Sequence, residues 1–171
     1  IWSSLEIQTA QLDLTENNLY TLSQGSKDVI KTIDEPIIFR LYYSPSFGEI
    51  SPPHGNYFKR VRELLEHFSA VSGGKIDLKI INPISFSVEE DEAVKFGIQG
   101  VPLDQSGELG YFGMAAINST DDRKTVPFFN PQREQFLEYD LTRLVYELAE
   151  PKKKKIGLII LELFHLIKCL I

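Results

Sequence analysis

Apolar and polar side chains follow two different periods along this chain, and each change of period marks a predicted element. A nearly continuous apolar run covers residues 37–43, which is typical of a strand buried in the centre of a sheet. Period-two alternation, typical of a strand, covers residues 5–14 and 75–81. Two further strand patterns, at residues 111–117 and 123–129, flank a polar turn and predict a hairpin.

Four helices are predicted from apolar side chains that recur every three or four positions and from end signals. They cover residues 24–33, 56–71, a short stretch from Ser87 to about Phe96, and 133–149. Ser23 is suited to cap the first of them. The acidic run 89–92 favours a helix start at Ser87, because acidic groups stabilise the positive end of the helix dipole.

The predicted order is β-α-β-α-β-α-β-β-α, which indicates a thioredoxin-like three-layer α/β fold with a mixed sheet. Strand, crossover helix and strand place residues 37–43 parallel to 75–81, and the hairpin supplies the antiparallel side. Between the central strand and its helix we expect a Pro- and Gly-rich loop over residues 44–55. Val101-Pro102 occupies the place where this fold often has a cis proline, so we expect a cis bond there.

The chain has one cysteine, Cys169, and none in the loop 44–55 where thioredoxin-type enzymes carry a Cys-x-x-Cys pair. One cysteine excludes an internal disulfide and a Cys-based zinc site. Because the thiolate is the nucleophile of that redox chemistry, we expect a protein that is not an enzyme and needs no cofactor. A redox enzyme on the same scaffold is therefore the less favoured alternative.

A carbohydrate- or peptide-binding module is a further alternative, because aromatic side chains flank the loop 44–55. The candidate ligand-binding residues are Tyr43, Phe47, His54, Tyr57 and Pro102. We expect half of the aromatic residues in this region to belong to the core. No metal site is predicted: an exposed helix face is the favoured interpretation of His67, and the run 89–92 lacks the spacing of a calcium loop.

Charge divides the chain into two parts. Residues 1–150 carry 13 basic and 23 acidic side chains, whereas residues 151–171 carry five basic and one acidic side chain. An acidic body disfavours binding to nucleic acid. We expect residues 1–150 to form the thioredoxin-like domain, and residues 151–171 to be a basic linker followed by the start of a truncated second α/β domain.

The apolar residues of the segment 156–171 are too many to leave in water, so we expect this segment to pack on its own domain or to drive self-association with a second copy. The chain begins at Ile1 and its only methionine is Met114, so the natural start is expected upstream. No run of about 20 apolar residues is present in the sequence.

Several motifs together resemble one family. They are Asp13-Leu14-Thr15-Glu16-Asn17, Leu19-Tyr20-Thr21-Leu22-Ser23, Val61-Arg62-Glu63-Leu64-Leu65, Gly73-Gly74-Lys75, Glu90-Asp91-Glu92-Ala93, Gly97-Ile98-Gln99-Gly100-Val101-Pro102, Tyr111-Phe112-Gly113, Pro127-Phe128-Phe129 and Glu138-Tyr139-Asp140-Leu141-Thr142-Arg143-Leu144. Over about residues 12–158 the chain is similar to the auxiliary component of gliding-motility-type ABC transport systems. That family has no assigned catalytic residues, so none are transferred.

The resemblance implies a membrane-anchored protein on the extracytoplasmic, periplasmic face of the cell membrane. It implies a transmembrane segment just upstream of residue 1, and an ABC permease and its ATPase as partners. It also implies a full second α/β domain from near Lys155. The chain departs from that pattern after Leu158, where residues 161–171 replace the expected glycine-containing turn.

Overall fold

The structure is a computed structural model that describes residues 21–105 and 107–149. Its five strands are β1 (Ile37–Tyr43), β2 (Ile76–Ile81), β3 (Gly100–Pro102), β4 (Leu109–Asn118) and β5 (Arg123–Val126). Its helices are α1 (Gln24–Lys31), α2 (Pro45–Ile50), α3 (Pro52–Val71), α4 (Val88–Lys95), the 3-10 helix η1 (Pro131–Phe136) and α5 (Leu137–Ala149). The predicted strand 5–14 and the segment 151–171 lie outside the described residues.

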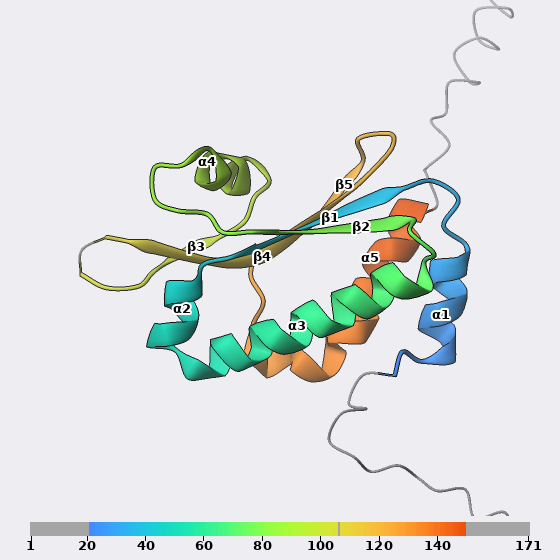
Figure 1. The fold of residues 1–171 in the computed structure, drawn as a ribbon, viewed down its shortest axis with the longest axis horizontal. Coiled ribbons are helices and arrows are strands. Elements are labelled where there is room, and N and C mark those ends of the chain that lie inside the picture. Colours follow the sequence, from blue (N-terminus) through green and yellow to red (C-terminus); the bar gives the residue numbers. More distant parts are fainter. Residues whose placement is uncertain (1–20, 106, 150–171) are drawn as a thin grey trace, which may run out of the picture.

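The strands form one mixed sheet in the order β2-β1-β4-β3, and β5 also pairs with β4 (Figure 1). β1 runs parallel to β2, with Ile37 opposite Ile76, and antiparallel to β4. β3 and β5 share the outer edge of β4, because they pair with different parts of it. The predicted parallel pair and the predicted hairpin are both confirmed.

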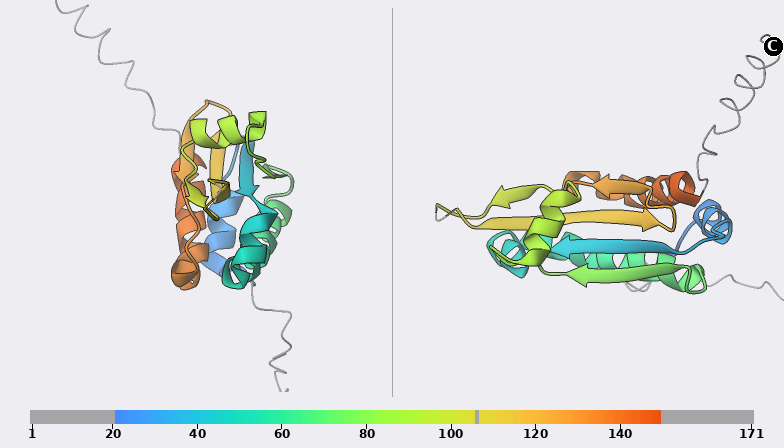
Figure 2. Two further views of the ribbon diagram at one scale, coloured as in Figure 1. Left: turned by 90° about the vertical axis from the view of Figure 1, so that its left-hand side faces the viewer. Right: turned by 90° about the horizontal axis from the view of Figure 1, so that it is seen from above.

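The two faces of the sheet are covered unequally (Figures 1 and 2). α1, α2, α3 and α5 lie on one face, and α4 lies on the other. The side chains of β1 explain this division, because Phe39 and Leu41 belong to the large core on the helix side, while Tyr42 belongs to a smaller core. That smaller core also contains Ala93 of α4 and Tyr111 of β4. α4 is therefore held to the sheet by a separate, small hydrophobic cluster.

Hydrogen bonds join α1 to α5. The Ser26 hydroxyl donates to Glu138 Oε1 at 2.5 Å, and the backbone N–H of Ser23 donates to the same oxygen at 2.8 Å. Thr142 Oγ1 donates to Ser26 Oγ at 2.9 Å. Burial alone would raise the pKa of Glu138, but the hydrogen bonds from Ser26 and Ser23 outweigh burial and lower it.

The predicted helix starts are confirmed at both serine caps. Ser23 Oγ accepts from the backbone N–H of Ser26, and Ser87 Oγ accepts from that of Glu90. The structure corrects the prediction of a loop over residues 44–55, because α2 and the first turn of α3 occupy this stretch. The reason is that Pro45 and Pro52 sit at the first helical positions, where the missing N–H of proline costs no hydrogen bond.

The expected cis bond before Pro102 is wrong, because the described residues contain no cis peptide bond. Pro102 is the last residue of β3 and pairs with Leu109 in extended conformation, which an ordinary trans bond supplies. Gly113 lies in β4 between the stretches that pair with β3 and β5. A Cβ built on it would lie 2.7 Å from the carbonyl oxygen of Pro127 and 2.8 Å from that of Val126, so only glycine fits there.

Candidate binding groove

A groove lies beyond the carboxyl ends of β1 and β2, with a volume of about 690 Å³. In open α/β sheets, ligands bind in crevices outside the carboxyl ends of parallel strands. The groove is lined by Ser44, Pro45 and Ser46 after β1, by Asn82, Pro83, Ile84, Ser85 and Phe86 after β2, by Glu90 of α4, and by Gly107, Glu108 and Leu109 at the start of β4. Its volume falls within the range of small-molecule pockets, about 300–1,000 Å³.

Ser44 connects three parts of the groove wall. Its backbone N–H donates to the carbonyl oxygen of Tyr111 at 2.9 Å, and its hydroxyl accepts from the backbone N–H of Tyr111 at 3.1 Å. The hydroxyl also points to the carbonyl oxygen of Pro83, at 3.5 Å. Because Ser44 is buried, this hydroxyl is a structural group that joins the end of β1 to β4 and to the loop after β2.

The loop after β2 presents large apolar side chains to solvent. Phe86 is fully exposed, Ile84 is 64% exposed, and Val88 at the start of α4 is 80% exposed. Phe86 has a φ of 65°, in the left-handed region that a non-glycine residue rarely adopts. Two hydrogen bonds order the turn, since the backbone N–H of Phe86 donates to Glu90 Oε2 at 2.7 Å and that of Ser87 donates to the carbonyl oxygen of Ile84 at 3.0 Å.

Glu90 connects this loop to the sheet. Its second carboxylate oxygen, Oε1, accepts from the Tyr111 hydroxyl at 2.9 Å. Burial, followed by the hydrogen bond to Glu90, raises the pKa of Tyr111 to about 12. Tyr111 is therefore a neutral hydrogen-bond donor at neutral pH, and Glu90 accepts on both of its oxygens.

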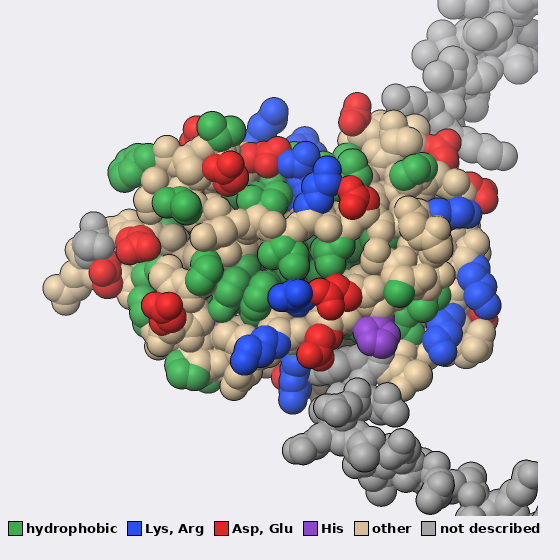
Figure 3. Space-filling view, viewed as in Figure 1, with side chains coloured by type: hydrophobic (Ala, Val, Ile, Leu, Met, Phe, Trp, Pro, Cys, Tyr) green, Lys and Arg blue, Asp and Glu red, His purple; other side chains and the backbone are tan. Residues whose placement is uncertain are grey.

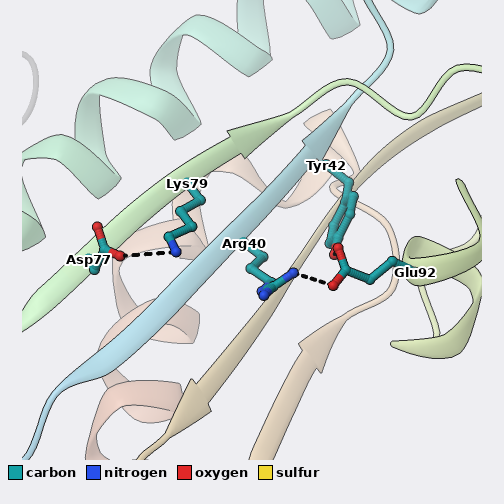
Figure 4. Close-up of polar contacts among 5 residues, drawn as sticks. All are labelled: Arg40, Tyr42, Asp77, Lys79 and Glu92. Carbon is teal, nitrogen blue, oxygen red and sulfur yellow. Dashed lines mark hydrogen bonds and ion pairs between the residues drawn. The ribbon is translucent and has the colours of Figure 1, made fainter. Parts of the chain in front are cut away.

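A second tyrosine and glutamate pair fixes α4 further along the same face (Figure 4). The Tyr42 hydroxyl donates to Glu92 Oε2 at 3.1 Å, and Arg40 donates to Glu92 Oε1 and forms an ion pair with it. Burial raises the pKa of Tyr42 to about 12, with Glu92 adding to the effect and Arg40 opposing it. The guanidinium groups of Arg40 and Arg123 both lie 5.5 Å from the ring centre of Phe96, at the end of α4. On the open part of this sheet face, Lys79 and Asp77 lie 3.6 Å apart (Figure 4).

None of the five candidate ligand-binding residues predicted from the sequence lines the groove. Tyr43, Phe47 and Tyr57 are buried in the large core. The Tyr43 ring stacks on Phe58, with ring centres 3.7 Å apart. These three side chains are packing groups, and the expectation that half of the aromatic residues here belong to the core understated their burial. Pro102 is exposed on β3.

His54 is half-buried in the first turn of α3. Its Nδ1 lies 2.7 Å from Ser51 Oγ, and its ring lies against Phe47 and Phe128, with ring centres 4.6 and 5.8 Å away. Burial lowers the pKa of His54, so its imidazole is neutral at neutral pH. A hydroxyl beside an imidazole is the arrangement of a nucleophile and its base, but the location of Ser51 and His54 among aromatic rings fits a packing role.

The remaining candidates stay on the surface or serve the backbone. His67 is exposed on α3, as expected. Gly73 and Gly74 both have positive φ angles and come directly after the C-cap Ser72 of α3, so they end the helix. Within residues 21–105 and 107–149, no group of three His, Cys, Asp or Glu side chains has the arrangement of a metal site.

Most of the residues that line the groove give no sign of it in the sequence. Asn82-Pro83 indicates only the end of a strand, and Ser44 only the start of a loop. One local feature of the groove is visible in Ser85-Phe86-Ser87, where a large apolar residue stands in a polar turn ahead of an acidic helix.

The fold and the groove define an α/β protein with a mixed sheet and a ligand-sized depression at the carboxyl ends of its parallel strands. Residues 16–117 match the model of a family described as Domain of unknown function (DUF7088). Because the match spans more than half of the 171 residues, the chain belongs to this family. Neither the curated proteins nor the solved structures contain a significant match to the chain. Among the described helices, none has the length and apolar character needed to cross a membrane.

Proposed function

We propose that the domain is a non-catalytic, thioredoxin-like binding module in an ABC transport system, held on the extracytoplasmic face of the membrane by a segment upstream of residue 1. The support for the transport context is the set of motifs in residues 12–158 that resemble the auxiliary component of such systems. The proposed partners are the ABC permease and its ATPase.

Four features support a thioredoxin-like architecture. β1, α3 and β2 form a parallel β-α-β unit, β4 and β5 form an antiparallel hairpin, and α5 comes after the hairpin. α4 lies on the opposite face of the sheet from α3 and α5 (Figure 1). The proposed fold also requires the strand predicted over residues 5–14.

The buried hydroxyl of Ser44 is the observation that carries the non-catalytic part of the proposal. Redox enzymes of this architecture carry a thiol pair just after the central strand, and this chain has Ser44-Pro45-Ser46 there. A reactive group must be accessible, whereas Ser44 Oγ is buried and accepts a hydrogen bond from the backbone of β4. What remains at this end of the sheet is a groove with apolar and acidic walls, which suits binding.

An insulin-reduction assay of the full chain with added dithiothreitol tests this proposal. We expect the rate of the reductant alone, both for the native chain and for Cys169→Ser. Thioredoxin under the same conditions provides the positive control for the assay. Turnover by the native chain that disappears in Cys169→Ser would contradict the proposal.

The transport context needs a separate measurement. Site-specific photo-crosslinking from Phe86 in cells that produce the full-length protein should trap the permease, because the permease is the proposed partner that is exposed on the extracytoplasmic face. Crosslinks from Lys31, which is exposed on α1 away from the groove, provide the matched control. Equal capture of the permease from both positions, or no capture of it from Phe86, would reject the permease as a partner.

A peptide-binding module that is unconnected with transport is the second candidate. The exposed apolar side chains Ile84 and Phe86 on the rim of the groove favour it, because the apolar side chains of a peptide can pack on them.

A further inference from the structure

Phe86 is held out into solvent by an ordered turn. A fully exposed phenylalanine at a φ of 65° is unfavourable in two ways, since its ring is hydrated and its backbone is strained. The hydrogen bonds from Phe86 N–H to Glu90 and from Ser87 N–H to Ile84 keep the turn in this conformation. The turn therefore presents the ring in a fixed position. Aromatic side chains at the centres of protein interfaces are presented to their partners in the same way.

Phe86 belongs to a larger apolar rim. Ile84 is 64% exposed on the same loop, and both side chains line the groove, while Val88 at the start of α4 is 80% exposed. Scattered exposed apolar residues are ordinary, but three of them within five residues beside a groove indicate an interaction surface.

The charge at this surface has one sign. Glu90 and Glu108 line the groove, and none of its lining residues is Lys, Arg or His. Glu89 and Asp91 are exposed in the first turn of α4 beside it. Figure 3 shows hydrophobic and acidic side chains at the α4 end of the molecule, with Lys and Arg side chains next to them toward the middle of the same face. A phosphate backbone or an anionic lipid headgroup would be repelled by this surface, so its charge is complementary to a cationic partner.

We propose that this groove docks an extended segment of a partner protein in which lysine or arginine residues stand next to apolar residues. The apolar side chains of that segment would pack on Phe86 and Ile84, and its cations would face Glu90 and Glu108. The inference rests on the proposed role as a binding module and specifies the chemistry of its partner.

A synthetic peptide provides a direct probe of this chemistry. Its sequence is Lys-Lys-Lys-Lys-Ile-Gly-Leu-Ile-Ile, which is a lysine-rich apolar sequence that the chain itself contains at residues 152–160. One control peptide has four glutamates in place of the lysines, and a second has serines in place of the isoleucines and leucine. Fluorescence anisotropy of each labelled peptide with the full chain gives its affinity.

We expect the first peptide to bind, with an affinity that decreases as the salt concentration increases. The glutamate peptide should not bind, and the serine peptide should bind about tenfold more weakly than the first. Phe86→Ser should lower the affinity of the chain for the first peptide at least about tenfold. Val94→Ser is the matched control, because Val94 is an exposed apolar residue of α4 outside the groove, and it should leave affinity unchanged. Equal binding of the lysine and glutamate peptides, or equal affinity of the native chain and Phe86→Ser, would overturn the proposal.

The chain's own basic segment is the competing occupant. A full-length variant with glutamate at positions 152–155 separates the two cases. Equal peptide affinity of this variant and the native chain supports a separate partner. A several-fold tighter affinity of the variant, together with loss of a concentration-dependent dimer in sedimentation, would overturn the proposal by assigning the groove to residues 152–160 of a second copy. Absence of peptide binding with no insulin reduction would reject this inference alone, whereas thiol-dependent insulin reduction would reject the proposed function.

Discussion

Replacing Ser44 with alanine tests whether the groove wall depends on one buried hydroxyl. Ser44 is 3% exposed, and its Oγ accepts from the backbone N–H of Tyr111 at 3.1 Å. The contact to the carbonyl oxygen of Pro83, at 3.5 Å, lies at the limit of hydrogen-bond geometry and adds little. Alanine fits the same space but leaves the N–H of Tyr111 without this acceptor.

The expected loss derives from that single hydrogen bond. A buried donor left without a partner costs about 1–3 kcal/mol, so we expect Ser44→Ala to lower the free energy of unfolding by about 1–2 kcal/mol. For a chain of this size, that loss lowers the melting temperature by about 2–8 °C. Urea unfolding of the full chain, monitored by far-ultraviolet circular dichroism, measures the free energy. Amide hydrogen exchange at Tyr111 reports the site itself, and its rate should increase.

Ser46→Ala is the matched control. Ser46 lines the same groove two residues further on, is half-buried, and makes no side-chain hydrogen bond among the described residues. We expect a change within about 0.5 kcal/mol. If Ser44→Ala unfolds at the same urea concentration as the native chain, or if both variants lose the same free energy of unfolding, then the Ser44 hydroxyl is not a structural group. A reactive role for this serine would then have to be considered again.

Three further predictions concern the sheet, the groove wall and the helix layer. Gly113→Ala should destabilise the chain by about 1–3 kcal/mol in urea unfolding, because the added Cβ would clash with two carbonyl oxygens. Gly25→Ala should not destabilise it, because a Cβ there meets no atom within 4 Å, and equal stability of the two variants would contradict this prediction. Since the pKa of Tyr111 is raised from 10.0 to about 12, stability should fall as pH rises from 10 to 12, and Tyr111→Phe should remove one late-ionising group from an absorbance titration; an unchanged titration would refute the assignment. Because the pKa of Glu138 is lowered below 4.5, its contribution is present above that pH and disappears as pH falls through the folded pKa. The stability difference between the native chain and Glu138→Gln should therefore shrink in acid, and a difference independent of pH would show that the carboxylate is not stabilised by Ser26.

The strands and long helices can be predicted from the sequence because local pattern and burial agree there. The apolar run 37–43 predicts a buried strand, and β1 has the same bounds. Prolines are harder to interpret, because a proline can stand at the start of a helix or end one, and the choice depends on the residues after it. Pro45 and Pro52 both start helices. The bond before Pro102 depends on its pairing with Leu109, which no local pattern contains.

The candidate site is harder to predict than the fold, because exposure is a tertiary property. An aromatic residue beside a Pro- and Gly-rich stretch looks available to a ligand. Tyr43 is a core residue because α3 brings the ring centre of Phe58 to 3.7 Å from its own, and Phe47 is one because Phe128 packs edge-on against its ring and Gly110 lies beside it. Phe86 in contrast is exposed because the turn that contains it is stabilised by Glu90, four residues later in the chain.

The acidic start of α4 therefore has a role beyond the helix dipole. Glu90 accepts from the Phe86 backbone with one oxygen and from the Tyr111 hydroxyl with the other, so the turn that presents Phe86 is bonded through one carboxylate to a fully buried tyrosine of β4. Tyr111 in turn is bonded through its backbone to Ser44 at the end of β1. The two walls of the groove are thus connected by hydrogen bonds at one residue of the sheet. A docked segment that displaced the Phe86 turn would have to break the bond to Glu90, and for this reason we expect the groove to bind its partner with little change of backbone conformation.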